Sequence, residues 1–88
     1  MNTTTAQPAI TMQPVDSSKI HSIGHDAQTG TLAIRFKNKD GEPAALYHYR
    51  NVTSEDFAAL QGAESIGSHF HKAIKPFAEK YPYQRIGA

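Results

Sequence analysis

The sequence predicts an α+β fold in which a three-stranded antiparallel meander is followed by two helices packed on one face of the sheet. Residues 31–37 alternate between apolar and polar side chains, as expected for a half-buried strand. Asp40-Gly41 follows this strand and is a strong short-range hairpin signal. Residues 53–77 then carry a helix-capping pattern and the three- and four-residue apolar spacing of amphipathic helices.

The hairpin register can be derived by assuming a two-residue type I′ turn at Asp40-Gly41. The resulting pairs on one face are Phe36 with Ala45, Ile34 with Tyr47, and Leu32 with Tyr49. The other face pairs Arg35 with Leu46, Ala33 with His48, and Thr31 with Arg50. The first face is apolar and aromatic and the second is polar and basic. A one-residue slip would mix the two sets, so the register is self-supporting.

The strand that precedes this hairpin is expected over residues 20–25. Ile20 and Ile23 would fall on opposite faces of a regular strand, so a bulge or a strand buried on both sides is expected. Residues 1–14 have no charged side chain and few apolar ones, which predicts a disordered N-terminal arm before a single domain over residues 15–86.

Two helices are expected after the hairpin. Thr53 can cap the first helix, Asp56 can complete a capping box, and Gly62 can end it. The second helix has an apolar stripe made of Ile66, Phe70, Ile74 and Phe77. It ends or kinks before Pro76, which has no backbone N–H. Residues 78–88 are predicted to be mostly a tail.

Composition excludes several classes of protein. The 88 residues suffice for one small domain, and the absence of cysteine excludes a disulfide framework, a thiolate nucleophile and a cysteine zinc site. A formal net charge of +1 excludes a highly basic nucleic-acid wrapper. The sequence has no apolar run long enough to span a membrane and no secretion signal, so a cytoplasmic location is expected.

Four ordered segments resemble the KTSC domain family, over about residues 15–86. They are Val15-Asp16-Ser17-Ser18-Lys19-Ile20, Tyr47-His48-Tyr49, Ala63-Glu64-Ser65-Ile66-Gly67-Ser68-His69-Phe70, and Tyr81-Pro82-Tyr83-Gln84-Arg85-Ile86. The chain departs from the family pattern at His71, where asparagine is usual, and over residues 75–80, which look inserted. The resemblance implies a small domain of the kind found at the C-terminus of some lysyl-tRNA synthetases and as stand-alone bacterial and phage proteins, with RNA binding as the suggested function.

No enzyme is expected. His69 and His71 resemble a metal pair, but residues two apart on a helix point in different directions and no further ligand lies nearby in the sequence. Ser65 is better explained as a helix cap than as a nucleophile, because no oxyanion glycine pattern surrounds it. We therefore expect no metal, no cofactor and no catalytic residue.

Two groups of side chains are candidate contacts for RNA or another single-stranded nucleic acid. The preferred group is Lys72, Lys75, Lys80, Arg85, Tyr81 and Tyr83, in which bases interleave with aromatic rings. The second group is Arg35, Lys37, His48 and Arg50, on the polar face of the hairpin. For the second group, a solvated outer face is the more economical interpretation, and Tyr47 and Tyr49 are expected in the core.

The alternative hypothesis is a protein-interaction module, such as a phage-encoded modulator of a host protein. Its contacts would be the exposed aromatic and histidine positions His48, Tyr81 and Tyr83. The small net charge favours neither hypothesis, and the sequence does not define an oligomeric state.

Overall fold

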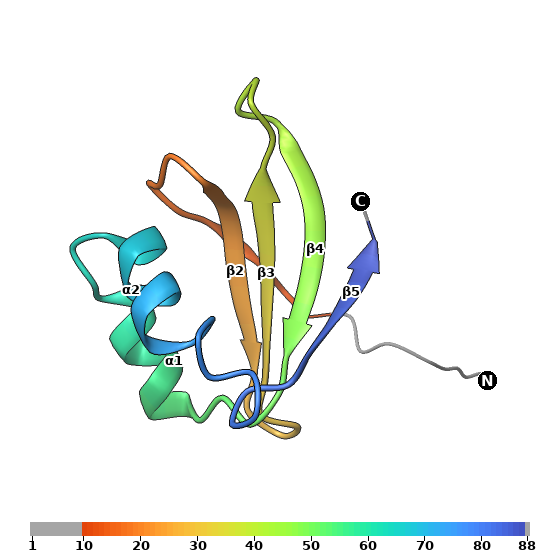
Figure 1. Ribbon diagram of the computed structural model, residues 1–88, viewed down its shortest axis with the longest axis vertical. Helices are drawn as coiled ribbons and strands as arrows, with labels where there is room; N and C mark the ends of the chain where they lie inside the picture. Colours follow the sequence, from red (N-terminus) through yellow and green to blue (C-terminus); the bar gives the residue numbers. More distant parts are fainter. Residues whose placement is uncertain (1–9, 88) are drawn as a thin grey trace.

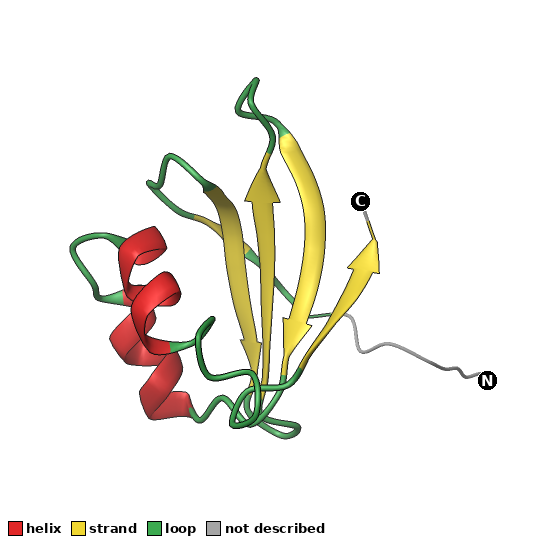
Figure 2. Cartoon of the chain, in the orientation of Figure 1, coloured by secondary structure: helices red, strands yellow, loops and turns green. Residues whose placement is uncertain are grey.

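The computed structural model describes residues 10–87 and confirms an α+β fold (Figure 1). The elements in chain order are β1 (Gln13–Pro14), β2 (Ile20–Asp26), β3 (Thr31–Lys37), β4 (Pro43–Tyr49), α1 (Ser54–Gln61), α2 (Ile66–Ala73) and β5 (Tyr83–Gly87). The strands form one antiparallel sheet of five strands in the order β1-β2-β3-β4-β5. Both helices lie on the same side of this sheet (Figure 2).

The prediction of three strands is wrong because two further strands extend the sheet at its edges. β5 lies in the segment predicted to be a tail, and it pairs with β4 through Tyr49↔Tyr83 and Tyr47↔Arg85. The residues of β5 are exposed or half-buried and lack an apolar alternation. An edge strand can form through backbone pairing alone, so this strand leaves almost no signal in the sequence.

The predicted hairpin register is confirmed at four positions, but the predicted turn is wrong. Four of the expected pairs are present: Leu32↔Tyr49, Ala33↔His48, Ile34↔Tyr47 and Arg35↔Leu46. Near the turn the register shifts, and Lys37 lies opposite Pro43. Gly41 has φ 79°, whereas Asp40 is not in the left-handed region, so a type I′ turn is excluded. The hydrogen bonds from Gly41 N to Asn38 O and from Asn38 N to Glu42 O instead close a three-residue loop.

The hydrophobic core lies between the helices and the face of the sheet that carries Leu32 and Ile34. Its buried members are Ile20, Ile23, Leu32, Ile34, Tyr49, Val52, Leu60, Ile66, Phe70, Ile74 and Tyr81. Ile20 and Ile23 both reach this core because the β2–β3 register shifts between Ile20 and Ser22, which is the irregularity expected from their spacing. The core therefore agrees with the predicted apolar face, and Phe36 and Tyr47 pack at its margin.

The opposite face of the sheet is partly covered by the chain before residue 15. A Cβ atom on Gly24 would collide with the carbonyl oxygen of Thr11 and meet Cγ2 of Ile10, so this segment crosses directly over β2. Ala33 and His48, which lie in the same cross-strand row as Gly24, are buried. Residues 10–14, part of the predicted arm, therefore lie against the sheet and pair with β2 through Gln13 and Pro14. The rest of the predicted arm, residues 1–9, lies outside the described residues.

The helix boundaries follow the predicted capping residues. The hydroxyl of Thr53 accepts from Asp56 N, and the Asp56 carboxylate accepts in turn from Thr53 N, which completes the capping box. Gly62 is the C-cap of α1. Phe77 departs from the predicted apolar stripe: it is 51% exposed because α2 ends before Pro76. Within residues 10–87 no helix combines the length and hydrophobicity needed to cross a membrane.

Candidate functional site

The candidate site is a groove between α2 and the part of the sheet formed by β3, β4 and β5. Its volume is about 590 Å³, and we call it the aromatic groove. Its lining residues are Lys19, Phe36, Lys37, Ala45, Tyr47, Tyr49, Phe70, His71, Lys75, Ala78 and Tyr83. β5 brings Tyr83 against the β4 tyrosines, and the residues that follow α2 add Lys75 and Ala78 to the lining.

The aromatic rings of the groove form one connected cluster. Tyr83 lies 5.3 Å from Tyr49 and 5.8 Å from Tyr47, measured between ring centroids. Phe70 meets Tyr49 edge-on at 5.2 Å and Phe36 at 5.6 Å. Edge-to-face and offset pairs of this kind are favourable beyond the area that they bury. The rings therefore hold one another in place, and the wall of the groove is preorganised.

Tyr83 is the ring of this cluster that is open to a ligand. Tyr49 and Phe70 are 5% and 1% exposed and act as its support, whereas Tyr83 is 56% exposed. Burial, together with the nearby Tyr83 and Tyr47, raises the pKa of Tyr49 to about 12. The Tyr49 phenol is consequently neutral and able to donate a hydrogen bond throughout the physiological pH range.

The rim of the groove is basic. Lys19, Lys37 and Lys75 line it, and no carboxylate belongs to the lining residues. Lys37 is fixed in place because its Nζ donates to the Ser17 carbonyl oxygen at 2.7 Å. Lys19 and Lys75 are exposed. This combination of aromatic wall and cationic rim suits an anionic ligand that also has a flat apolar part.

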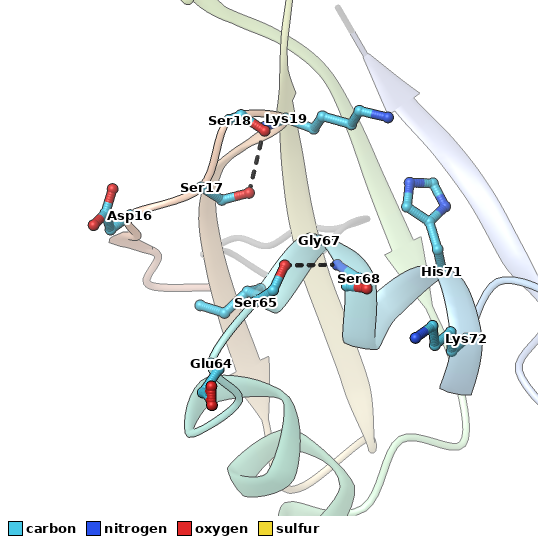
Figure 3. Close-up of a pocket in the computed structure, with 11 residues that line it drawn as sticks. Asp16, Ser17, Ser18, Lys19, Glu64, Ser65, Gly67, Ser68, His71 and Lys72 are labelled. Atoms are coloured by element: carbon cyan, nitrogen blue, oxygen red, sulfur yellow. Dashed lines mark hydrogen bonds between the residues drawn. The ribbon is translucent and has the colours of Figure 1, made fainter.

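A second pocket of about 390 Å³ adjoins the groove at the start of α2 (Figure 3). We call it the serine pocket, and it is lined by Asp16, Ser17, Ser18, Lys19, Glu64, Ser65, Ile66, Gly67, Ser68, His71 and Lys72. Lys19 and His71 line both pockets. Two lysines and two carboxylates balance each other in the serine pocket, so its lining lacks the one-sided charge of the groove.

Serine hydroxyls in this pocket already serve the backbone. Ser17 Oγ accepts from Lys19 N at 3.3 Å and from Ile20 N at 3.2 Å. Ser65 Oγ accepts from Ser68 N at 3.2 Å and caps α2, as the sequence predicted (Figure 3). A Cβ on Gly67 would lie 3.4 Å from Ser17 Oγ, so α2 approaches this loop closely. These roles are structural, and among residues 10–87 no hydrogen bond joins His71 to a carboxylate of the pocket.

The four basic residues predicted on the outer face of the hairpin do not form one surface. Arg35 Nη1 donates to the Ala44 carbonyl oxygen at 2.6 Å, and Lys37 lines the aromatic groove instead. His48 is 7% exposed, and burial together with the nearby Arg50 lowers its pKa. Only Arg50 of the four is exposed.

The preferred C-terminal group is also divided by the fold. Lys75 and Tyr83 line the aromatic groove, Lys72 lines the serine pocket, and Arg85 lies on β5 opposite Tyr47. Tyr81 and Lys80 do not line the groove, and the Lys80 Nζ lies 5.0 Å from the Tyr81 ring centroid.

Tyr81 is 4% exposed, so its ring has no free face for a ligand in this structure. Its hydroxyl donates to Asp56 Oδ2 at 3.1 Å. Partial burial acts to raise the pKa of Asp56, but hydrogen bonds from Thr53 and from Tyr81 outweigh it, and the pKa is lowered. The ring therefore connects the last loop to the cap of α1.

Sequence reasoning missed the contribution of Lys19 and assigned Phe36 and Tyr47 to the core alone. The family-like segments were the available signal, because the Val15–Ile20 and Ala63–Phe70 runs meet at the serine pocket and the tyrosine-containing runs meet in the groove. Among the residues that the structure describes, no cluster of three or more His, Asp or Glu side chains could hold a metal ion.

Fold and site together define a small α+β protein whose sheet and second helix enclose an aromatic groove with a basic rim. The chain belongs to the KTSC domain family, whose sequence model matches residues 16–81. It is 36% identical over 72 residues to an uncharacterised protein of Stutzerimonas stutzeri, a match that covers 82% of this chain and 92% of that one. A protein of Tsukamurella paurometabola is 40% identical over 65 residues, which cover 74% of this chain and 90% of the relative. The crystal structure of a KTSC domain protein from Yersinia pestis is similar with a TM-score of 0.74 and 34% identity, over 90% of this chain and 100% of that one.

Proposed function

We propose that this protein is a non-enzymatic binding module for RNA or another single-stranded nucleic acid, and that the aromatic groove is the contact surface. The observation that carries the proposal is the half-exposed Tyr83 ring, held by Tyr47 and Tyr49 beside a rim of lysines without a carboxylate. Single-stranded nucleic acids are bound by this combination of stacking rings and cations that follow the backbone.

The proposal assigns different roles to the ring and to the lysines. A base stacked on Tyr83 contributes about 1–3 kcal/mol, or roughly 5- to 150-fold in affinity, with little sequence preference. Lys19, Lys37 and Lys75 would contact about three phosphates, which gives a salt slope near −2 on single strands. Binding should therefore be weak at physiological salt and measurable at low salt.

The test is a titration of fluorescently labelled single-stranded RNA and DNA, followed by anisotropy at several salt concentrations. Tyr83→Ala should weaken binding roughly 5- to 150-fold without changing the salt slope. Phe77→Ala is its matched control, because Phe77 is similarly exposed at 51% but does not line the groove. Equal effects of the two substitutions would contradict the groove as the contact.

The lysines can be tested in the same way. Lys75→Ala should make the salt slope shallower by about 0.7 and weaken binding to all sequences alike. Lys80→Ala removes the same charge next to Tyr81, at a residue that does not line the groove, and should have a much smaller effect. The absence of binding even at low salt would leave the protein-interaction hypothesis, and of its predicted contacts Tyr83 is exposed, as is Phe77.

A further inference from the structure

The free edge of β5 differs from the opposite edge of the sheet. At that opposite edge, β1 consists of Gln13 and Pro14 only, and a proline in so short a strand limits further pairing. β5 has five residues, Tyr83–Gly87, and no proline inside it. It lies at the outside of the sheet with no neighbour beyond it among residues 10–87 (Figure 1). β5 is therefore the edge that can accept another strand.

The pairing with β4 determines which backbone groups of β5 point outward. Arg50 N donates to Pro82 O at 2.8 Å, so residues 50 and 82 form a hydrogen-bonded pair. Hydrogen-bonded and non-hydrogen-bonded pairs alternate along an antiparallel ladder. Gln84, opposite His48, therefore directs its backbone N–H and C=O toward β4. Tyr83 and Arg85 direct theirs away from the sheet, to the free edge.

These directions restrict two copies of the strand to registers in which outward-facing residues lie opposite each other. We propose that the protein forms a symmetric dimer in which β5 pairs antiparallel with the partner's β5, so that the two sheets join into one. The backbone N–H and C=O of Tyr83 would form hydrogen bonds with those of the partner's Arg85, and those of Arg85 with the partner's Tyr83. Gln84 would lie opposite the partner's Gln84 at the twofold axis. A second copy fits this edge because the donors and acceptors at residues 83 and 85 are self-complementary about this axis.

Side-chain chemistry favours the same register. Tyr83 and Arg85 lie two residues apart and share the face of the sheet that carries the groove. In the proposed register each half-exposed Tyr83 ring faces the partner's arginine, a pair that attracts through a cation–π interaction. If the twofold axis passed through residue 85 instead of residue 84, the two Arg85 side chains would lie opposite each other, and their like charges would repel. This inference does not depend on the ligand of the groove.

Single-cysteine crosslinking tests this register, and the chain has no cysteine of its own. In a non-hydrogen-bonded pair the Cα atoms are about 4.5 Å apart, within the range of a disulfide. Gln84→Cys should therefore form a covalent dimer rapidly in oxidised glutathione. Arg85→Cys should not exceed background, because its counterpart lies about 9 Å away, two residues along the neighbouring strand. Lys39→Cys, in the exposed β3–β4 loop, measures that background.

Sedimentation of the wild-type protein from micromolar to millimolar concentration is the second measurement. A monomer–dimer equilibrium is expected. Arg85→Pro should weaken it roughly 25-fold, because two symmetric hydrogen bonds are lost at about a factor of five each. The N–H of residue 85 points away from β4, so the fold should persist, which circular dichroism checks. A wild-type protein that stays monomeric would overturn the proposal, as would Arg85→Cys crosslinking as fast as Gln84→Cys.

Discussion

Phe70→Ala tests whether α2 is anchored to the sheet through the floor of the aromatic groove. Phe70 is 1% exposed and makes edge-on contacts with Phe36 and Tyr49. Removing a buried phenylalanine ring costs about 3–5 kcal/mol, of which the two aromatic contacts account for about 1–3 kcal/mol. A domain of this size is stable by only about 4–12 kcal/mol. The substitution should therefore remove about a quarter or more of the free energy of unfolding.

The measurement is urea-induced unfolding followed by far-ultraviolet circular dichroism, since the chain has no tryptophan. Phe77→Ala is the control: the ring is 51% exposed, so its loss should cost about 1 kcal/mol or less. The two phenylalanines belong to the same apolar stripe in the sequence, and only the structure separates them. A loss of stability that is the same in both variants would refute the packing described for α2.

Three further predictions concern the capping box, a buried histidine and the covered face of the sheet. Asp56→Ala should lower the free energy of unfolding, measured in urea, by about 1–2 kcal/mol. The pKa of Asp56 is lowered in the folded protein. The stabilisation by Asp56 is therefore present above about pH 4 and is lost as the pH falls through the folded-state pKa. An undiminished difference in strong acid would contradict this role. The pKa of His48 is also lowered in the folded protein, so as the pH falls His48 is protonated in the unfolded chain before it is protonated in the folded one. The free energy of unfolding should therefore decrease as the pH drops below about 6.5. His48→Gln should flatten this pH dependence. Gly24→Ala should lower the free energy of unfolding by about 1–3 kcal/mol and displace Thr11. The Val15 amide donates to the His21 carbonyl oxygen, and faster hydrogen exchange of this amide would reveal the displacement.

The parts of the fold that could be predicted are those encoded by neighbouring residues. The alternation over residues 31–37 was sufficient for the central register, and the Thr53 and Gly62 signals were sufficient for the ends of α1. The turn at Asp40-Gly41 was assigned to the wrong type because the same dipeptide also suits a three-residue loop in which only the glycine has a positive φ.

The candidate site could be predicted only in part, because its residues meet through β5. Tyr83 and Lys75 were predicted contacts and do line the groove, but nothing in the sequence indicated that Tyr83 would pack on Tyr49. Conversely, Tyr81 has the same local context as Tyr83 and is buried. The residues of an exposed edge strand do not alternate between apolar and polar side chains. The sequence therefore does not distinguish the exposed ring of Tyr83 from the buried ring of Tyr81.

The aromatic groove as a binding surface is tested most directly by an amide-detected nuclear magnetic resonance titration with a single-stranded oligonucleotide at low salt. We expect the largest shifts at the groove, at Tyr47, Tyr83 and Lys75, with a much smaller response at Arg35 and Arg50 on the opposite side. Saturating shifts confined to the groove would support the proposed function. Shifts centred on Arg35 and Arg50, or no shifts at all, would contradict it.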